Sequence, residues 1–133
     1  MKTYITTIIL CLIPLFAQGQ VMMKAISSSA KIGDEPYTKW TKCSIPIRID
    51  IEKNEIKIYA TNEPIIINIT AIVKEEKTEK KKTYIYDGVD NKGNECSIMF
   101  DFEEIKDGEE LIFLSIGYLE LNMAFDYILE YQN

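Results

Sequence analysis

Acidic and amide side chains crowd around two glycines in residues 84–100, YIYDGVDNKGNECSIMF, a composition typical of calcium-binding loops. An EF-hand loop needs Asp or Asn at its third position and Gly at its sixth. Counted from Asp87 the third position is Val89, and counted from Asp90 it is Lys92. Neither frame fits, so the sequence predicts no metal site in this stretch.

The same stretch fits a β-hairpin better. Residues 90–93, DNKG, match a type I turn followed by a glycine in the left-handed conformation. Counting outward from this turn pairs Tyr84 with Phe100 and Tyr86 with Ile98, so apolar side chains oppose one another. We therefore predict a hairpin that points Tyr84 and Tyr86 toward the inner face of a sheet.

Catalytic chemistry has few candidates. The chain contains no histidine, which excludes Ser-His-Asp and Cys-His nucleophiles and the usual zinc sites. Asp101 and Glu103 share a strand face, and paired carboxylates across a cleft hydrolyse glycosides. Because these acids alternate with Phe100 and Phe102, we expect them on a solvated face. The sequence thus predicts a non-enzymatic protein without catalytic residues, cofactor or metal, with a carboxylate-dependent hydrolase as the second alternative.

The first nineteen residues have the features of an export signal. Lys2 precedes a nearly uncharged run rich in Ile and Leu, and Ala17 and Gly19 have the spacing that a signal peptidase reads. The run is too short to favour a membrane-spanning helix. We predict a signal peptide over residues 1–19, a single β-barrel-like domain over residues 20–133, and a periplasmic or secreted location without a stable membrane span.

Two cysteines, Cys43 and Cys96, follow the predicted signal peptide. Export to an oxidising compartment permits one disulfide between them. The sequence does not place their Cβ atoms, so a disulfide and two buried free thiols both fit.

Net charge argues against nucleic acid as a partner. The formal charge is −6, and an acidic protein gains little from attraction to phosphate. The lysine-rich run over residues 74–82, KEEKTEKKK, is interrupted by carboxylates that cancel its field. It is most simply a solvated hairpin tip.

The positioning elements are strands, because apolar and polar residues alternate with a period of two along most of the chain. A two-residue loop at Lys53-Asn54 would pair Ile49 with Ile58. In residues 64–74, one face would carry Ile65, Ile67, Ile69, Ala71 and Val73, and the other Ile66 and Ile72. Residues 21–32 are a weaker strand candidate, and residues 27–39 the one long loop-like segment.

Short polar gaps between strands favour antiparallel neighbours. We therefore predict an all-β fold: an antiparallel up-and-down meander of about seven or eight strands, closed or nearly closed into a barrel. A two-sheet β-sandwich is the alternative.

Four aromatic residues are the candidate ligand-binding side chains. The expected register turns Tyr84, Tyr86 and Tyr127 inward, and Trp40 stands where it would plug one end of a barrel. Inward tyrosines offer stacking surface and hydroxyls to a small apolar or aromatic ligand. The competing interpretation is a packed core, since a chain of this length leaves little room for a wide cavity.

The AQGQ ending of the signal segment, Trp40 before the strand IPIRIDI, the hairpin DNKGNECSI and the last strand FDYILEY form a recognisable pattern. In this pattern the chain resembles small secreted bacterial β-barrel proteins of unknown function, lipocalin-like or calycin-like. The resemblance implies a barrel and assigns no further residue roles. We expect an exported, non-enzymatic barrel that binds a small apolar ligand. The first alternative is an interaction module that docks another envelope or secreted protein through a sheet edge or the Ile66/Ile72 face.

Overall fold

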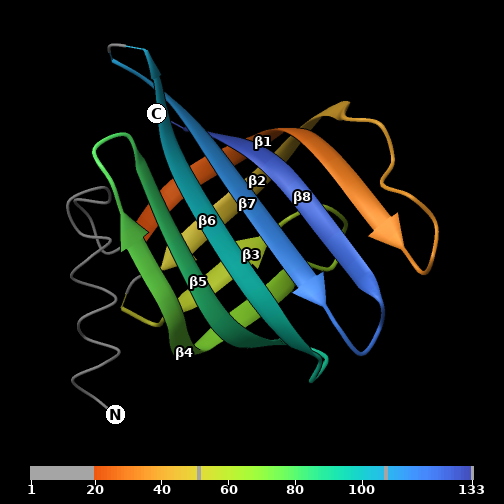
Figure 1. Cartoon of the computed structure of the whole chain (residues 1–133). Helices are drawn as coiled ribbons and strands as arrows, with labels where there is room; N and C mark the ends of the chain where they lie inside the picture. Colours follow the sequence, from red (N-terminus) through yellow and green to blue (C-terminus); the bar gives the residue numbers. More distant parts are fainter. Residues whose placement is uncertain (1–19, 51, 107, 133) are drawn as a thin grey trace.

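The chain folds into a closed β-barrel. The computed structural model describes residues 20–50, 52–106 and 108–132, and the predicted signal peptide lies outside these residues. Within them eight antiparallel strands follow one another around the barrel in sequence order, without a helix (Figure 1). This confirms the predicted all-β meander and its closure, in place of a two-sheet sandwich. The strands are β1 (Gln20–Ile32), β2 (Thr41–Asp50), β3 (Glu55–Ile58), β4 (Ile65–Lys77), β5 (Lys81–Asp90), β6 (Glu95–Lys106), β7 (Glu109–Tyr118) and β8 (Met123–Tyr131).

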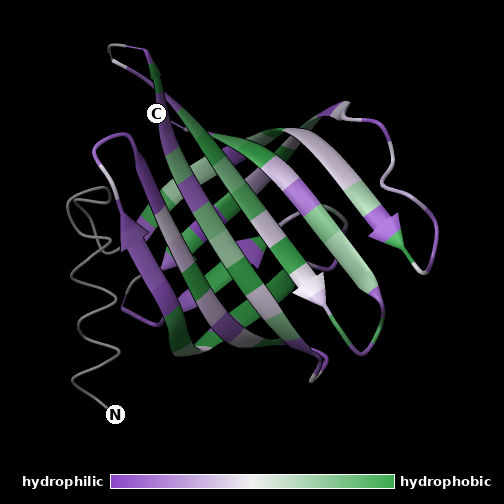
Figure 2. Cartoon of the chain, viewed as in Figure 1, coloured by the Kyte–Doolittle hydropathy of each residue, from purple (hydrophilic) through white to green (hydrophobic). Residues whose placement is uncertain are grey.

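Closure comes from the pairing of the first strand with the last. β1 pairs with β8 from Met23↔Tyr131 to Ile32↔Met123. Hydrophobic and hydrophilic residues alternate along the strands, visible as green and purple or white bands on β5 to β8 (Figure 2). One set of alternate side chains therefore fills the interior, and the other faces solvent.

The β5–β6 hairpin forms as the sequence predicts. Tyr84 pairs with Phe100 and Tyr86 with Ile98. The Gly93 N–H donates to the carbonyl of Asp90 at 3.0 Å, and Gly93 has a φ of 85°, a left-handed conformation that glycine adopts without steric cost.

The β2–β3 connection differs from the two-residue loop expected at Lys53-Asn54. Asp50 pairs with Glu55 and Ile49 with Ile56, so the connection spans residues 51–54. The Asp50 carboxylate accepts the Lys53 N–H at 3.3 Å and favours this longer turn. The expected pairing of Ile49 with Ile58 is wrong by two positions. A shift of two keeps every side chain on its face, so the interior is unaffected.

Two β-bulges in β4 change which of its residues point inward. The pairing with β5 shifts at Thr70 and again at Val73, and each shift leaves one residue unopposed. As a result Ile72 opposes Tyr86 and packs against the core, whereas Val73 is exposed. The expected grouping of Ala71 and Val73 on one face with Ile67, and of Ile72 on the other face with Ile66, is therefore wrong.

The long loop expected over residues 27–39 is shorter, because β1 continues to Ile32. Residues 33–40 fold back over the outside of the barrel, where Ser29 donates a hydrogen bond to the Thr38 carbonyl at 2.7 Å. Trp40 then packs edge-on against Phe113, with ring centroids 6.0 Å apart. Phe113 alternates with the buried Ile112 and Leu114, so it lies on the outer face. Trp40 thus covers the outside of the barrel and does not plug its end.

Candidate functional site

Tyr84 and Tyr86 are part of a packed aromatic core. Their exposed fractions are 1% and 0%, and their rings stack with centroids 6.4 Å apart. Phe102 meets Tyr84 edge-on at 6.0 Å and stacks with Phe100 at 6.2 Å. Rings in such mutual contact stabilise the barrel through burial, and they leave little free surface for a ligand between them.

The other two predicted lining residues lie elsewhere. Tyr127 is buried in the interior, where burial, with added repulsion from Cys43 and Asp126, raises its pKa to about 12. Trp40 is on the outer face and 47% exposed. The structure therefore gathers the three tyrosines inside and separates Trp40 from them, so the four side chains do not form one lining.

Both cysteines of the described chain are free thiols. The Cys43 thiol donates to the Ala25 carbonyl at 3.4 Å. Burial, reinforced by the charges of Asp90 and Asp87, raises the pKa of Cys96 to about 11. A thiol with such a pKa stays protonated at neutral pH and is a poor nucleophile.

The predicted carboxylate pair stands on the outside of the barrel. Asp101 accepts a hydrogen bond from the Thr83 hydroxyl, and Glu103 is exposed. Asp101 opposes Phe113 across the β6–β7 pairing, on the same outer face. Among the described residues, no group of His, Cys, Asp or Glu is arranged to hold a metal ion.

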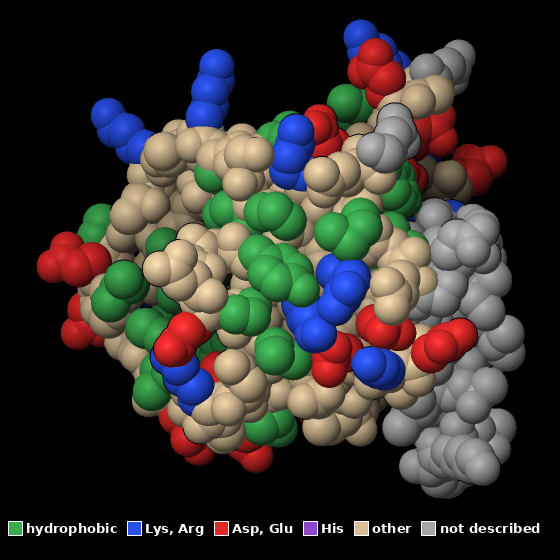
Figure 3. Space-filling view, turned by 180° about the vertical axis from the view of Figure 1, so that it is seen from behind, with side chains coloured by type: hydrophobic (Ala, Val, Ile, Leu, Met, Phe, Trp, Pro, Cys, Tyr) green, Lys and Arg blue, Asp and Glu red, His purple; other side chains and the backbone are tan. Residues whose placement is uncertain are grey.

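The Ile66/Ile72 face does not exist as one surface. Ile66 lies on the outer face in a row with Met22, Arg48 and Lys57, whereas Ile72 points inward because of the bulge at Thr70. From behind, hydrophobic side chains gather near the middle of this outer surface, with basic side chains among them (Figure 3). Within the described residues, the part of β4 beyond Ile69 pairs only with β5 and so leaves one edge of the strand unpaired. Its bulges and lysines discourage the addition of a strand from another protein at this edge.

The mouth of the barrel offers the more promising site. We call the mouth the hollow of about 370 Å³ at the end where β3 joins β4, β5 joins β6 and β7 joins β8. It is lined by Thr61, Glu63, Pro64, Ile65, Asp90, Asn91, Lys92, Asn94, Tyr118, Leu121, Met123 and Phe125.

The polar floor of the mouth is built around the Asp90 carboxylate. Its Oδ1 accepts the backbone N–H groups of Lys92 and Asn94, each at 2.9 Å. Burial alone would raise the pKa of Asp90, but the hydrogen bonds from Asn94, Lys92 and the Tyr118 hydroxyl outweigh it and lower that pKa. Asp90 is therefore an ionised acceptor at neutral pH.

Tyr118 joins this floor to the apolar wall. Its ring meets Phe125 edge-on with centroids 6.3 Å apart. Burial first, and the nearby Asp90 charge second, raise the Tyr118 pKa well above its usual value. Tyr118 is consequently a neutral hydroxyl that donates to Asp90 at physiological pH.

The wall of the mouth is held in place by contacts between loops. The Asn91 side chain donates to the Pro64 carbonyl at 3.3 Å and accepts the Ile66 N–H at 3.1 Å. These bonds tie the β5–β6 turn to the β3–β4 connection. The mouth is thus partly preorganised, with an apolar wall beside a fixed anionic acceptor.

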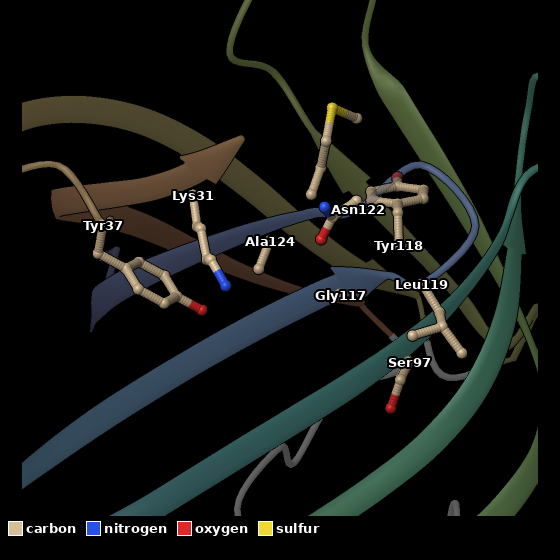
Figure 4. Close-up of a pocket in the computed structure, with 9 residues that line it drawn as sticks. Lys31, Tyr37, Ser97, Gly117, Tyr118, Leu119, Asn122 and Ala124 are labelled. Atoms are coloured by element: carbon tan, nitrogen blue, oxygen red, sulfur yellow. The ribbon is translucent and has the colours of Figure 1, made fainter. Parts of the chain in front are cut away.

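A second hollow, of about 400 Å³, lies on the outer face beside the mouth. We call it the outer groove, and Figure 4 shows its parts: Lys31 and Tyr37 approach from the β1 side, and Leu119 and Ser97 stand toward β6 (Figure 4). Gly117 and Ala124 form the floor between them. Tyr118 and Met123 line both hollows.

Sequence patterns did not reveal the mouth, because its residues come from several connections. One signal was present in the turn over residues 119–122, LELN, which carries two leucines where polar residues are usual. Leu119 borders the outer groove and Leu121 borders the mouth.

Comparisons of the chain with protein-family models, with curated proteins and with solved structures found no match. No helix among the described residues is long and apolar enough to span a bilayer. The resemblance to lipocalin-like secreted proteins stays a prediction.

Proposed function

We propose that this chain is an exported, non-enzymatic barrel that binds a small apolar or aromatic molecule at its mouth. The observation that carries the proposal is the pairing of an apolar wall with the Asp90–Tyr118 floor in a hollow of about 370 Å³. Small-molecule sites commonly fall in this size range and combine apolar walls with a few placed polar groups.

The polar groups of the mouth indicate which chemical group the ligand carries. Asp90 is an ionised acceptor, and Glu63 adds a second carboxylate at the rim against the single cation Lys92. With two carboxylates against one cation, the mouth favours a ligand that carries a hydrogen-bond donor or a positive charge. The ligand class is therefore an apolar or aromatic body that carries a hydroxyl or ammonium group.

The proposal places the protein outside the cytoplasm. Residues 1–19 have the charge, apolar run and small residues of a cleaved export signal. A barrel in the periplasm or the secreted milieu would encounter small amphipathic molecules directly. The proposal assigns no catalytic residue and no cofactor.

Calorimetric titration with tryptamine, which joins an aromatic body to an ammonium group, tests the proposal. We expect saturable binding of one tryptamine per chain. Indole-3-acetate has the same ring system with a carboxylate, and we expect it to bind about tenfold more weakly or not at all, because Asp90 and Glu63 repel it.

Two arginine substitutions provide the matched control. Leu121→Arg adds a cation to the wall of the mouth and should weaken tryptamine binding about tenfold. Leu111→Arg makes the same change on β7 far from the mouth and should leave the affinity unchanged. Absence of saturable tryptamine binding, or equal affinities in the two variants, would contradict the proposal.

A further inference from the structure

The β7–β8 turn exposes an apolar side chain almost completely. Leu119 is 94% exposed, the largest exposed fraction among the large hydrophobic side chains of the described residues. Ile32 and Tyr37, at 60% and 48%, are exposed at the same end of the barrel. Clustered apolar exposure of this kind usually marks an interaction surface.

Leu119 stands between two hollows. The outer groove lies on one side of it, and a smaller hollow of about 200 Å³ lies on the other. Both hollows include Ser97 and Gly117. A Cβ added to Gly117 would have no neighbour within 4 Å, so the space above this residue is open. This surface therefore carries the projecting Leu119 side chain and, beside it, a hollow that can hold a side chain of the same size.

The walls of the outer groove are fixed to each other. The Gly33 N–H donates to the Asn122 carbonyl at 2.8 Å, and the Asn122 side chain donates to Asp34 at 3.4 Å. These bonds join the β1–β2 loop to the β7–β8 turn. The groove and its projecting leucine are consequently presented as one rigid unit.

Charge is distributed unequally along this surface. A cross-strand row runs over the outer face in the order Asp87, Ser97, Gly117, Ala124, Lys31. Glu95 lies beside Asp87 in the smaller hollow. Lys31 is half-buried, and no ion pair within the described residues includes it. The row itself therefore carries acidic side chains at the Asp87 end and a cation at the Lys31 end.

We propose that two copies of this chain associate through this surface about a two-fold axis near Gly117. The projecting Leu119 of each copy occupies the outer groove of the other. The two-fold arrangement reverses the row, so Lys31 of each copy faces Asp87 and Glu95 of its partner. A second copy of the chain fits because the same surface carries the projecting Leu119, the outer groove that accepts it, and charges of both signs. An isologous interface requires a surface that is complementary to itself in this way.

Sedimentation velocity of the full chain over a range of concentrations tests this inference. We expect a reversible monomer–dimer equilibrium in wild type. Leu119→Ser removes the projection and Gly117→Val fills the groove, and each should raise the dimer dissociation constant about tenfold. Both positions tolerate the change, since Leu119 is solvated and the Gly117 Cβ position is open.

Charge reversal distinguishes this arrangement from other dimers. Lys31→Glu should raise the dissociation constant, and the double variant Lys31→Glu/Asp87→Lys should restore it, because the reversed charges again face each other across the axis.

Met22→Ser alters the exposed apolar surface on the opposite side of the barrel and should have no effect. A wild type that stays monomeric at every concentration overturns the inference. A dimer that Met22→Ser weakens and Leu119→Ser does not also overturns it.

Discussion

Asp90 has two roles that one side chain can combine. One carboxylate oxygen accepts the N–H groups of Lys92 and Asn94 and so stabilises the β5–β6 turn. The carboxylate also lines the mouth beside Tyr118. The same residue thus links the local turn chemistry, visible in the motif DNKG, to the candidate binding site.

Replacing Asp90 with Ala should destabilise the fold by about 1–3 kcal/mol, because two backbone donors lose a charged acceptor. Hydrogen bonds lower the Asp90 pKa below its usual value near 3.8. The stabilisation is therefore present above that value and is lost as the pH falls through the lower pKa of the folded state. Urea unfolding at neutral and acidic pH measures both effects.

Glu79→Ala is the control for this experiment, since Glu79 is an exposed acid in the β4–β5 turn. It should change the free energy of unfolding by less than about 0.5 kcal/mol. If Asp90→Ala unfolds at the same urea concentration as Glu79→Ala, the hairpin does not depend on the Asp90 carboxylate.

At the scale of elements, Gly88 sets how closely β5 approaches its neighbours. A Cβ at this inward position would lie 2.8 Å from Cδ1 of Ile98 and 2.9 Å from both the Asn68 carbonyl oxygen and Cγ2 of Ile67. One of these contacts is with backbone, which cannot rotate away. The neighbouring strands therefore pack against Gly88 more closely than any residue with a side chain would allow.

Gly88→Ala should destabilise the protein by about 1–3 kcal/mol, the usual cost of overpacking a core. Gly117→Ala is the matched control, because it adds the same methyl group where nothing lies within 4 Å. It should be neutral or stabilising by up to about 1 kcal/mol, through the reduced entropy of the unfolded chain. Thermal unfolding compares them, and equal melting temperatures would refute the close approach at Gly88.

Local sequence predicted some elements well and others poorly, for physical reasons. The DNKG turn was predicted with its register because its residue types specify one turn geometry. The turn over residues 51–54 was misjudged, since a two-position shift preserves the inward face and leaves the alternation unchanged. The bulges at Thr70 and Val73 are set by pairing with β5, so the sequence of β4 alone did not reveal them.

At the level of the whole molecule, strand number and short connections favoured a closed or nearly closed barrel over a sandwich, and the structure is a closed barrel. They did not show where space remains inside it. The inward aromatic residues fill the middle, and the hollow lies at the mouth, where separate connections meet. Such a site depends on how distant segments come together, as the outward position of Trp40 against Phe113 also does.

If the proposed function is correct, a small molecule binds at the mouth and not within the aromatic core. Four of the five methionines of the chain follow the predicted signal peptide and provide probes for methyl NMR. Met123 lines the mouth, Met23 is fully buried in the core, and Met22 and Met99 lie on the outer face.

Titration of ¹³C-methyl-methionine protein with tryptamine shows which methionine methyl groups lie next to the bound ligand. We expect a saturable shift of the Met123 methyl signal, absent in Leu121→Arg, with little change at Met23. A dominant shift at Met23, or calorimetric saturation that leaves Met123 unmoved, would contradict it.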